Sequence, residues 1–241
     1  MIIYSLPPEP VFPNPLIDDV DDIVAIGGDL SPDRLIVAYK NGIFPWYDEN
    51  SPILWWSPDP RLILRPEELH VSRRLKRIIK QKKFTITVNH AFEDVINFCS
   101  KIKRKDCEGT WLVPEMIEAY INLHKIGYCH SVEAWCEGKL AGGLYGVSIG
   151  RVFFGESMFY RVSNASKVAF VWLTLMLKKA KFKLIDCQQV TSHLMKFGAK
   201  PINRRRFLIE LKKALWLNPP QDLWSPRILT DNDIDFSHIN S

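Results

Sequence analysis

Carboxylate and amide side chains stand inside two short apolar segments that resemble buried strands. Glu156 lies within VFFGESMF, and Asp186 and Gln188 flank Cys187 in LIDCQ. Residues two apart in a strand share one face, so we expect Asp186 and Gln188 to point together and Cys187 to point away. A buried carboxylate is costly unless it is hydrogen-bonded or paired. Two of them predict a polar site at the centre of a sheet, although structural hydrogen bonding would explain either one alone.

Apolar and aromatic residues form a second candidate set. Phe170, Leu173 and Leu177 recur at helical spacing and share one helix face, a pattern that is more often plain core than ligand pocket. Four tryptophans stand in polar or proline-rich stretches: Trp46, Trp55, Trp56 and Trp111. Exposed aromatic rings would suit stacking on nucleic-acid bases, and packing of the proline-rich chain explains them equally well.

Basic residues gather in one short segment of a chain whose net charge is only +5. Seven of them occur without an acid between Ser72 and Lys83: Arg73, Arg74, Lys76, Arg77, Lys80, Lys82 and Lys83. Acids collect instead near residues 18–22 and in the tail at residues 231–235. This asymmetry indicates a face for a polyanion, with a solvated helix that has no partner as the equal alternative.

The bulk composition excludes several classes of protein. With 46% hydrophobic residues in 241, the chain can bury a sizeable core. It has no uncharged apolar run of about 18 residues, and its first residues, MIIYSLPPEP, do not form a signal peptide, so we expect a cytoplasmic protein without a membrane span. Five scattered cysteines and six scattered histidines predict neither a disulfide framework nor a metal site.

The elements that must position these residues fall into two blocks. Residues 1–65 are rich in proline and aromatics and predict a small N-terminal lobe, while residues 66–241 predict the catalytic domain. The lobe contains one clear helix, with Ser31 as N-cap, Pro32 at its first position and Asn41-Gly42 as its stop. Short strands and turns are expected around it.

The second block has a regular pattern. Ser72 opens an amphipathic basic helix with Leu75, Ile78 and Ile79 inward. The further expected elements are a strand at 84–88, helices at 91–100 and 114–125, strands at 129–136, 140–148 and 152–159, a helix at 165–180, a strand at 183–187 and two more helices, the last capped by Asn203. This order predicts an α/β (α+β) fold that resembles acetyltransferases, in which a splayed mixed sheet with flanking helices makes a cleft for an acyl donor.

Eight stretches of the chain resemble the leucyl/phenylalanyl-tRNA–protein transferase family in order and spacing. They are GGDLS, GIFPWY, PILWWSPDPR, EGTW, GGLYGV, FFGESMF, NASK and LIDCQ, and the resemblance runs from about residue 25 to residue 206. The resemblance implies a two-lobed enzyme with an acetyltransferase-like larger lobe. It would move leucine or phenylalanine, and methionine less well, from aminoacyl-tRNA to the N-terminal Arg or Lys of acceptor proteins. The products would be marked for degradation by the N-end rule.

The resemblance also implies roles for individual residues. The catalytic polar site would be Glu156, Asp186 and Gln188. The side-chain pocket would comprise Leu144, Phe153, Ser157, Met158, Phe170, Leu173, Leu177 and Ile185. The terminal adenosine would lie near Trp46 and Trp111, and the tRNA acceptor stem would lie along Arg73, Arg74, Arg77 and Lys80. Departures from the family pattern are Gln189 for an apolar residue, Lys196-Phe197 for a small pair, and Leu144 where methionine is common.

The implied reaction needs no cofactor, because the donor is an activated ester, and neither ATP, a metal nor a covalent intermediate is required. The acceptor amine, with an unperturbed pKa of about 7.7–8.0, must lose a proton. We expect Asp186 to be its electrostatic partner and Gln188 to orient it, with the proton passing through Gln188, water or the terminal ribose. A monomer is expected to suffice.

Two other functions remain open at this point. A coenzyme-A-dependent N-acetyltransferase would share the fold, but residues 161–166 lack the glycines of its pyrophosphate loop. A non-catalytic tRNA-binding module would explain the basic helix and leave Glu156 and Asp186 without a purpose.

Overall fold

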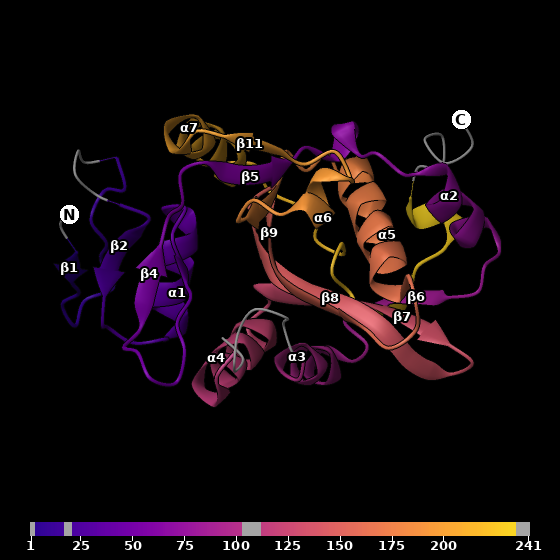
Figure 1. The fold of residues 1–241 in the computed structure, drawn as a ribbon, viewed down its shortest axis with the longest axis horizontal. Coiled ribbons are helices and arrows are strands. Elements are labelled where there is room, and N and C mark those ends of the chain that lie inside the picture. Colours follow the sequence, from indigo (N-terminus) through magenta and orange to yellow (C-terminus); the bar gives the residue numbers. More distant parts are fainter. Residues whose placement is uncertain (1–2, 17–20, 103–111, 235–241) are drawn as a thin grey trace.

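The computed structural model describes residues 3–16, 21–102 and 112–234 and contains two sheets (Figure 1). The smaller sheet has the strand order β1-β2-β4-β3, and the larger has the order β11-β5-β10-β9-β8-β7-β6-β12. In the larger sheet β9 and β10 run parallel while the pairs β6–β7, β7–β8 and β8–β9 are antiparallel. The expected mixed sheet with flanking helices is therefore confirmed.

The first elements build the smaller sheet: β1 (Tyr4–Ser5), β2 (Ile23–Ile26), α1 (Pro32–Lys40), β3 (Phe44–Pro45) and β4 (Leu54–Trp56). The next belong to the larger sheet and its helices: β5 (Arg61–Leu64), η1 (Pro66–Glu68), α2 (Arg73–Lys80), β6 (Thr85–Val88), α3 (Phe92–Ser100), α4 (Pro114–Lys125), β7 (Cys129–Cys136), β8 (Lys139–Ile149) and β9 (Val152–Tyr160). The chain continues through α5 (Ala165–Lys179), β10 (Leu184–Gln188), α6 (Ser192–Met195), β11 (Lys200–Ile202), α7 (Arg204–Leu215), β12 (Arg227–Ile228) and η2 (Asp231–Asp233).

Side-chain caps fix the predicted helix starts. Ser31, Ser72 and Asn203 are the N-caps of α1, α2 and α7, and each side-chain oxygen accepts a hydrogen bond from the backbone N–H three residues later. Such a bond satisfies one of the amide groups that a helix start leaves without a partner. The expected starts of these three helices are thus confirmed. The short edge strands β11 and β12 were not expected from the sequence.

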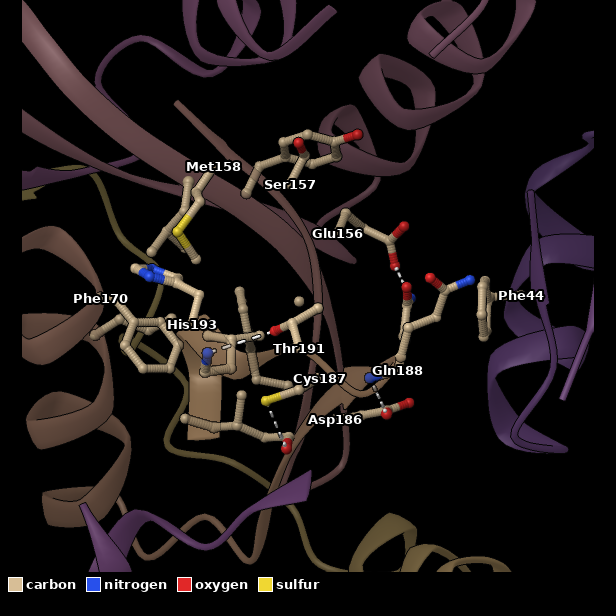
Figure 2. Close-up of a pocket in the computed structure, with 18 of the residues that line it drawn as sticks. Phe44, Glu156, Ser157, Met158, Phe170, Asp186, Cys187, Gln188, Thr191 and His193 are labelled. Atoms are coloured by element: carbon tan, nitrogen blue, oxygen red, sulfur yellow. Dashed lines mark hydrogen bonds between the residues drawn. The ribbon is translucent and has the colours of Figure 1, made fainter. Parts of the chain in front are cut away.

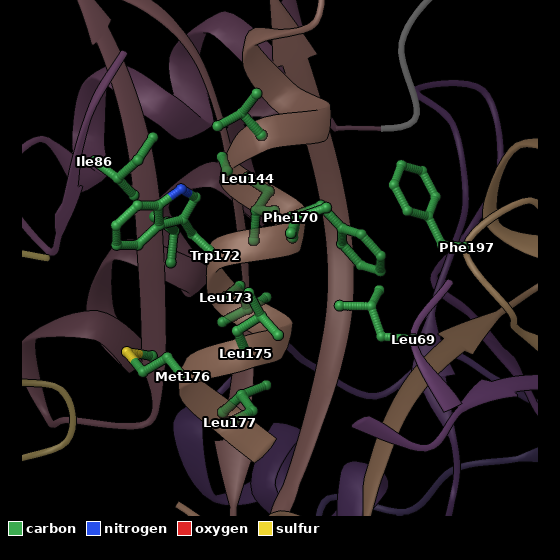
Figure 3. Close-up of a cluster of buried hydrophobic side chains, with 14 of the residues drawn as sticks. Leu69, Ile86, Leu144, Phe170, Trp172, Leu173, Leu175, Met176, Leu177 and Phe197 are labelled. Atoms are coloured by element: carbon green, nitrogen blue, oxygen red, sulfur yellow. The ribbon is translucent and has the colours of Figure 1, made fainter. Parts of the chain in front are cut away.

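Helices cover both faces of the larger sheet (Figure 1). α5 packs on β7 and β8 from one face, where α2 adjoins it, and α3 and α4 pack on the other face. Nearly every residue of α5 from Ala165 to Leu177 is buried, in a cluster that Phe197 and Leu69 close (Figure 3). Among the described residues, none of the helices is both long and apolar enough to cross a membrane.

The smaller sheet and α1 pack on the same side of the larger sheet as α4 and α7. α1 contacts α4 and α7, and one hydrophobic cluster runs from Val24 and Trp55 through Tyr120 to Phe207. β4 is the last strand of the smaller sheet along the chain, and β5, which begins five residues after β4 ends, belongs to the larger sheet. The division into domains after residue 65 stays a prediction, since this cluster is shared by both parts.

The sheet opens where β9 and β10 part. Their pairing runs from Leu184 opposite Val152 to Asp186 opposite Phe154, and it stops there. Glu156 and Gln188 lie beyond the last pair, and the register of β10 on β5 shifts between Asp186 and Gln188. Ligand sites in sheets with parallel strands form outside the carboxyl ends of those strands. The opening therefore provides the splayed cleft that the element order predicted.

A buried ion pair joins β5 to β10 at the base of this opening. Arg61 donates from Nε and Nη2 to the two oxygens of Asp186, at 2.8 and 2.7 Å. Both residues are fully buried, and the Arg61 guanidinium lies 4.8 Å from the centre of the Phe44 ring and 4.6 Å from that of Phe207. A two-point contact of this kind offsets the cost of removing both charges from water.

Breaking this pair should destabilise the whole chain. Asp186→Ala leaves Arg61 charged and unpaired, and we expect the free energy of unfolding in urea to fall by about 3–5 kcal/mol. The double change Arg61→Met with Asp186→Leu should recover most of that loss, because no buried charge remains. As a control, Lys82→Ala removes the exposed Lys82–Asp231 pair and should cost at most about 1 kcal/mol. An Asp186→Ala protein as stable as the parent would contradict this account.

Candidate active site

A cavity of about 280 Å³ opens at the parting of β9 and β10, between α5, α6 and the smaller sheet (Figure 2). It brings together most of the residues predicted from the sequence. Those that line it are Trp46, Leu144, Phe153, Glu156, Ser157, Met158, Phe170, Leu173, Ile185, Asp186 and Gln188. Figure 2 shows Glu156, Asp186 and Gln188 on one side of the cavity and Met158, Phe170 and His193 on the other.

The other predicted site residues lie elsewhere. Leu177 does not line the cavity, because it follows Leu173 by a full helical turn and is buried in the core that α5 forms with the larger sheet. Trp111 lies outside the described residues. The four cations expected to contact tRNA, Arg73, Arg74, Arg77 and Lys80, are exposed on α2 and do not line the cavity.

Glu156 is held by three donors from three elements. The Tyr39 hydroxyl of α1 donates to its Oε1 at 2.8 Å, and the Tyr120 hydroxyl of α4 donates to its Oε2 at 2.9 Å. The two hydroxyl oxygens lie 2.7 Å apart. Burial raises the pKa of Glu156 to about 7, and the negative charge of Asp186 adds to this, against the opposing effect of the tyrosine hydrogen bonds and that from Gln188. The carboxyl group therefore gains or loses its proton near neutrality.

Gln188 is the third donor, and its orientation follows from this bond. Its Nε2 donates to Glu156 Oε1 at 2.9 Å, which leaves the amide oxygen as the group able to accept a hydrogen bond from a substrate. The Gln188 backbone has a φ of 61°, in the left-handed region that residues other than glycine rarely adopt. Its N–H donates to Asp186 Oδ1 at 2.9 Å, so the carboxylate holds this strained residue in place.

The geometry of Asp186 differs from that expected for a group in contact with substrate. Arg61 binds both of its oxygens, the Gln188 N–H binds one of them again, and the side chain is fully buried. Asp186 lines the cavity, but its carboxylate is already bound by Arg61 and by the backbone of Gln188. Cys187, which we expected to point away from the site, also lines the cavity; it is buried, and desolvation is the chief cause that raises its thiol pKa well above the usual value, which disfavours the thiolate.

The apolar half of the cavity lies between α5, β9 and α6. Phe153, Met158 and Phe170 line it together with His193, and the rings of Phe170 and Phe197 meet edge to face at 5.0 Å. Burial lowers the pKa of His193, and Lys167 and Lys196 lower it further, so the imidazole stays neutral at physiological pH. A neutral, mostly apolar wall of this kind suits an uncharged substrate side chain.

Sequence reasoning missed several residues of the site. Tyr39, Tyr120 and Arg61 were not singled out, and neither was His193. One signal existed for Arg61: it opens the apolar segment RLIL, and an arginine in a buried strand requires a carboxylate, as Asp186 requires a cation. No local signal pointed to the tyrosines, because Tyr39 meets Glu156 across 117 residues of sequence.

Comparison with solved structures gives only weak likenesses. A GCN5-related N-acetyltransferase from Kribbella flavida has a TM-score of 0.34 at 12% identity, covering 70% of this chain and 60% of the other. L-PGS from Bacillus licheniformis has a TM-score of 0.39 at 10% identity, covering 67% of this chain and 50% of the other. Neither likeness is strong enough to support an argument about fold or function.

Comparison of sequences shows the family of the chain. Residues 63–212 match the family model of the leucyl/phenylalanyl-tRNA protein transferases, and residues 28–59 match that of their N-terminal domain. A leucyl/phenylalanyl-tRNA–protein transferase from Maridesulfovibrio salexigens is 55% identical, covering 89% of this chain and 90% of the relative. One from an Anaeromyxobacter species is also 55% identical, covering 89% and 92%. With catalytic-type residues gathered at one cavity and identity of this extent, the chain belongs to the leucyl/phenylalanyl-tRNA–protein transferase family.

Proposed function

We propose that this chain transfers leucine or phenylalanine, and methionine less well, from aminoacyl-tRNA to the N-terminal Arg or Lys of acceptor proteins, marking them for N-end-rule degradation. It acts as a cytoplasmic monomer and uses no cofactor. The observation that supports this best is that an apolar cavity opens directly onto the paired Glu156 and Gln188. The apolar half takes the side chain of the donor, and its ester carbon then lies at the polar half.

The volume of the cavity limits what can enter. At about 280 Å³ it lies just below the range of about 300–1,000 Å³ that is typical of small-molecule sites. A cavity of this size accommodates an amino-acid side chain and the adjoining ester. The terminal adenosine binds at the edge of the cavity, beside Trp46, which follows β3 of the smaller sheet and lines the cavity.

The proposed chemistry assigns a different part to each polar residue. The Gln188 amide oxygen accepts a hydrogen bond from the acceptor amine, and Glu156 keeps the amide in that orientation. Asp186 acts through Gln188, whose backbone it fixes, rather than as a partner of the amine itself. Because the donor ester is already activated, most of the rate comes from holding amine and ester carbon in contact.

A transfer assay separates this function from the two others that the sequence left open. Purified protein with leucyl- or phenylalanyl-tRNA should extend peptides that begin with Arg or Lys, and peptides beginning with Asp or Ser should serve poorly. Transfer of acetyl groups from acetyl-coenzyme A, with none from charged tRNA, would identify an N-acetyltransferase. Binding of tRNA without any transfer would identify a tRNA-binding module.

The raised pKa of Glu156 predicts a pH dependence of both activity and stability. The ionised carboxylate is the stronger acceptor for Tyr39, Tyr120 and Gln188, so activity should rise through pH 7. Deprotonation of the acceptor amine should cause a second rise at higher pH. Glu156→Gln should abolish the rise near pH 7 and lower kcat/KM by about 10²-fold. kcat/KM measured from pH 5.5 to 9 tests this.

Rising pH should change the contribution of Glu156 to stability in the direction opposite to its effect on activity. Between the ordinary pKa of 4.5 and the folded value of about 7, the folded chain holds a proton that the unfolded chain has lost. The contribution of Glu156 to the free energy of unfolding therefore falls as pH rises through this window. Glu156→Gln should remove that slope from urea unfolding curves, whereas Glu93→Gln, at an exposed position of α3, should change neither profile. An unchanged slope in Glu156→Gln would contradict the assignment.

The basic face of α2 should bind tRNA through phosphates. Arg73, Arg74 and Arg77 are exposed on this helix and lie outside the cavity lining. Replacing each by Ala should raise the apparent KM for tRNA, leave kcat nearly intact and lower the slope of log affinity against log salt by about one unit or less.

Two controls make this test specific. An aminoacyl-adenosine donor, which is too short to reach α2, should react equally with the parent and the variants. Lys125→Ala, at an exposed position of α4 on the opposite face of the sheet, should leave the salt slope unchanged (Figure 1). If Arg74→Ala impaired the short donor as strongly as full tRNA, α2 would belong to the fold or the reaction centre.

A further inference from the structure

The segment after α7 returns across the sheet on the α5 side. β12 pairs with β6, and the Leu229 N–H donates to the Ile86 carbonyl at 2.8 Å. Leu223 and Leu229 are buried in the cluster that contains α5, and Trp224 packs against that cluster. These three residues are therefore part of the core that also includes cavity-lining side chains.

Arg227 fixes the loop that carries Trp224. Its Nη1 donates to the carbonyls of Asp222, Leu223 and Ser225, at 3.1, 2.9 and 3.1 Å. Its Nε donates to Asp233 at 3.2 Å. One guanidinium thus closes the loop around Trp224 from both sides, and the β12–β6 pairing anchors Arg227 itself.

Trp224 is bound to the sheet by its backbone, its indole nitrogen and its ring. Its carbonyl accepts from Asn89 Nδ2 at 2.6 Å, and its Nε1 donates to Ser148 Oγ at 3.1 Å. The indole stacks on His130, with ring centres 4.3 Å apart and planes 1° from parallel. Burial lowers the pKa of His130 to about 3, so its ring is a neutral stacking surface.

The same indole contacts a residue of the cavity. The rings of Trp224 and Phe153 stack with centres 5.6 Å apart, and Phe153 lines the cavity. On the strand next to it, Gly146 leaves room for this ring, because a Cβ there would lie 2.6 Å from it. Phe153 is thus confined by the Gly146 backbone and by Trp224.

We propose that Trp224 is a positioning residue that sets the place of Phe153 and so determines which donor side chains fit the cavity. The proposal rests on the proposed function, in that the cavity takes the side chain of the aminoacyl donor. It assigns a role in donor specificity to a segment that does not itself line the cavity. Removing the indole lets Phe153 move back and enlarges the apolar half.

The test is a competition between leucyl- and phenylalanyl-adenosine donors in one reaction. The ratio of the two products does not depend on how much enzyme is folded. Trp224→Ala should shift this ratio by about tenfold toward phenylalanine, since a wider pocket holds the larger ring and loses contact with leucine. It should also raise KM for the leucyl donor more than it lowers kcat. Trp224→Phe keeps a ring behind Phe153 and should shift the ratio by less than about threefold.

The matched control is Trp216→Ala, because Trp216 is 82% exposed and its loss should leave the ratio unchanged. Should Trp224→Ala fail to fold, Trp224→Leu, which keeps an apolar side chain without the flat ring, should still shift the ratio by at least about threefold. A parental ratio in the folded Ala or Leu variant would overturn the proposal. A parent enzyme that transfers neither donor would instead overturn the proposed function.

Discussion

A buried guanidinium–carboxylate pair is the constraint on which the site depends. Arg61 lies between an aromatic ring of the smaller sheet, Phe44, and one of α7, Phe207, and it binds both oxygens of Asp186 on β10. One side chain thereby ties together both sheets and a helix. Asp186 then fixes the backbone of Gln188 in the left-handed region. Because two charges are removed from water, the pair is stable only while both partners are present.

The two carboxylates of the site show how environment divides the work between like groups. Asp186 is fully buried and matched by a full positive charge, whereas Glu156 is met only by neutral donors in a desolvated position. The first therefore serves as a fixed support, and the second can change protonation near neutral pH. Gln188 donates a hydrogen bond to each of them, from its backbone N–H to Asp186 and from its side-chain amide to Glu156.

Local rules predicted much of this from the sequence, and distance in the chain explains the rest. Helix starts at Ser31, Ser72 and Asn203 follow from capping chemistry, and the carboxylates Glu156 and Asp186 were found because burial makes them costly. Leu177 was assigned to the pocket because spacing gives the face of a helix but not how far along it the cavity extends. The contacts of Tyr39, Arg61 and Trp224 join segments whose pairing no local pattern encodes.

The hydrogen-bonded group of Tyr39, Tyr120, Glu156 and Gln188 draws one member from each of α1, α4, β9 and β10. A chain in which α1 has not yet docked on α4 lacks the Tyr39 hydroxyl that binds Glu156, even though the Glu156–Gln188 bond within the sheet can form. The complete hydrogen-bonded group therefore forms only once α1 and α4 are both in place. For a protein of this family, this means that a partly folded copy does not yet hold the full set of contacts around Glu156.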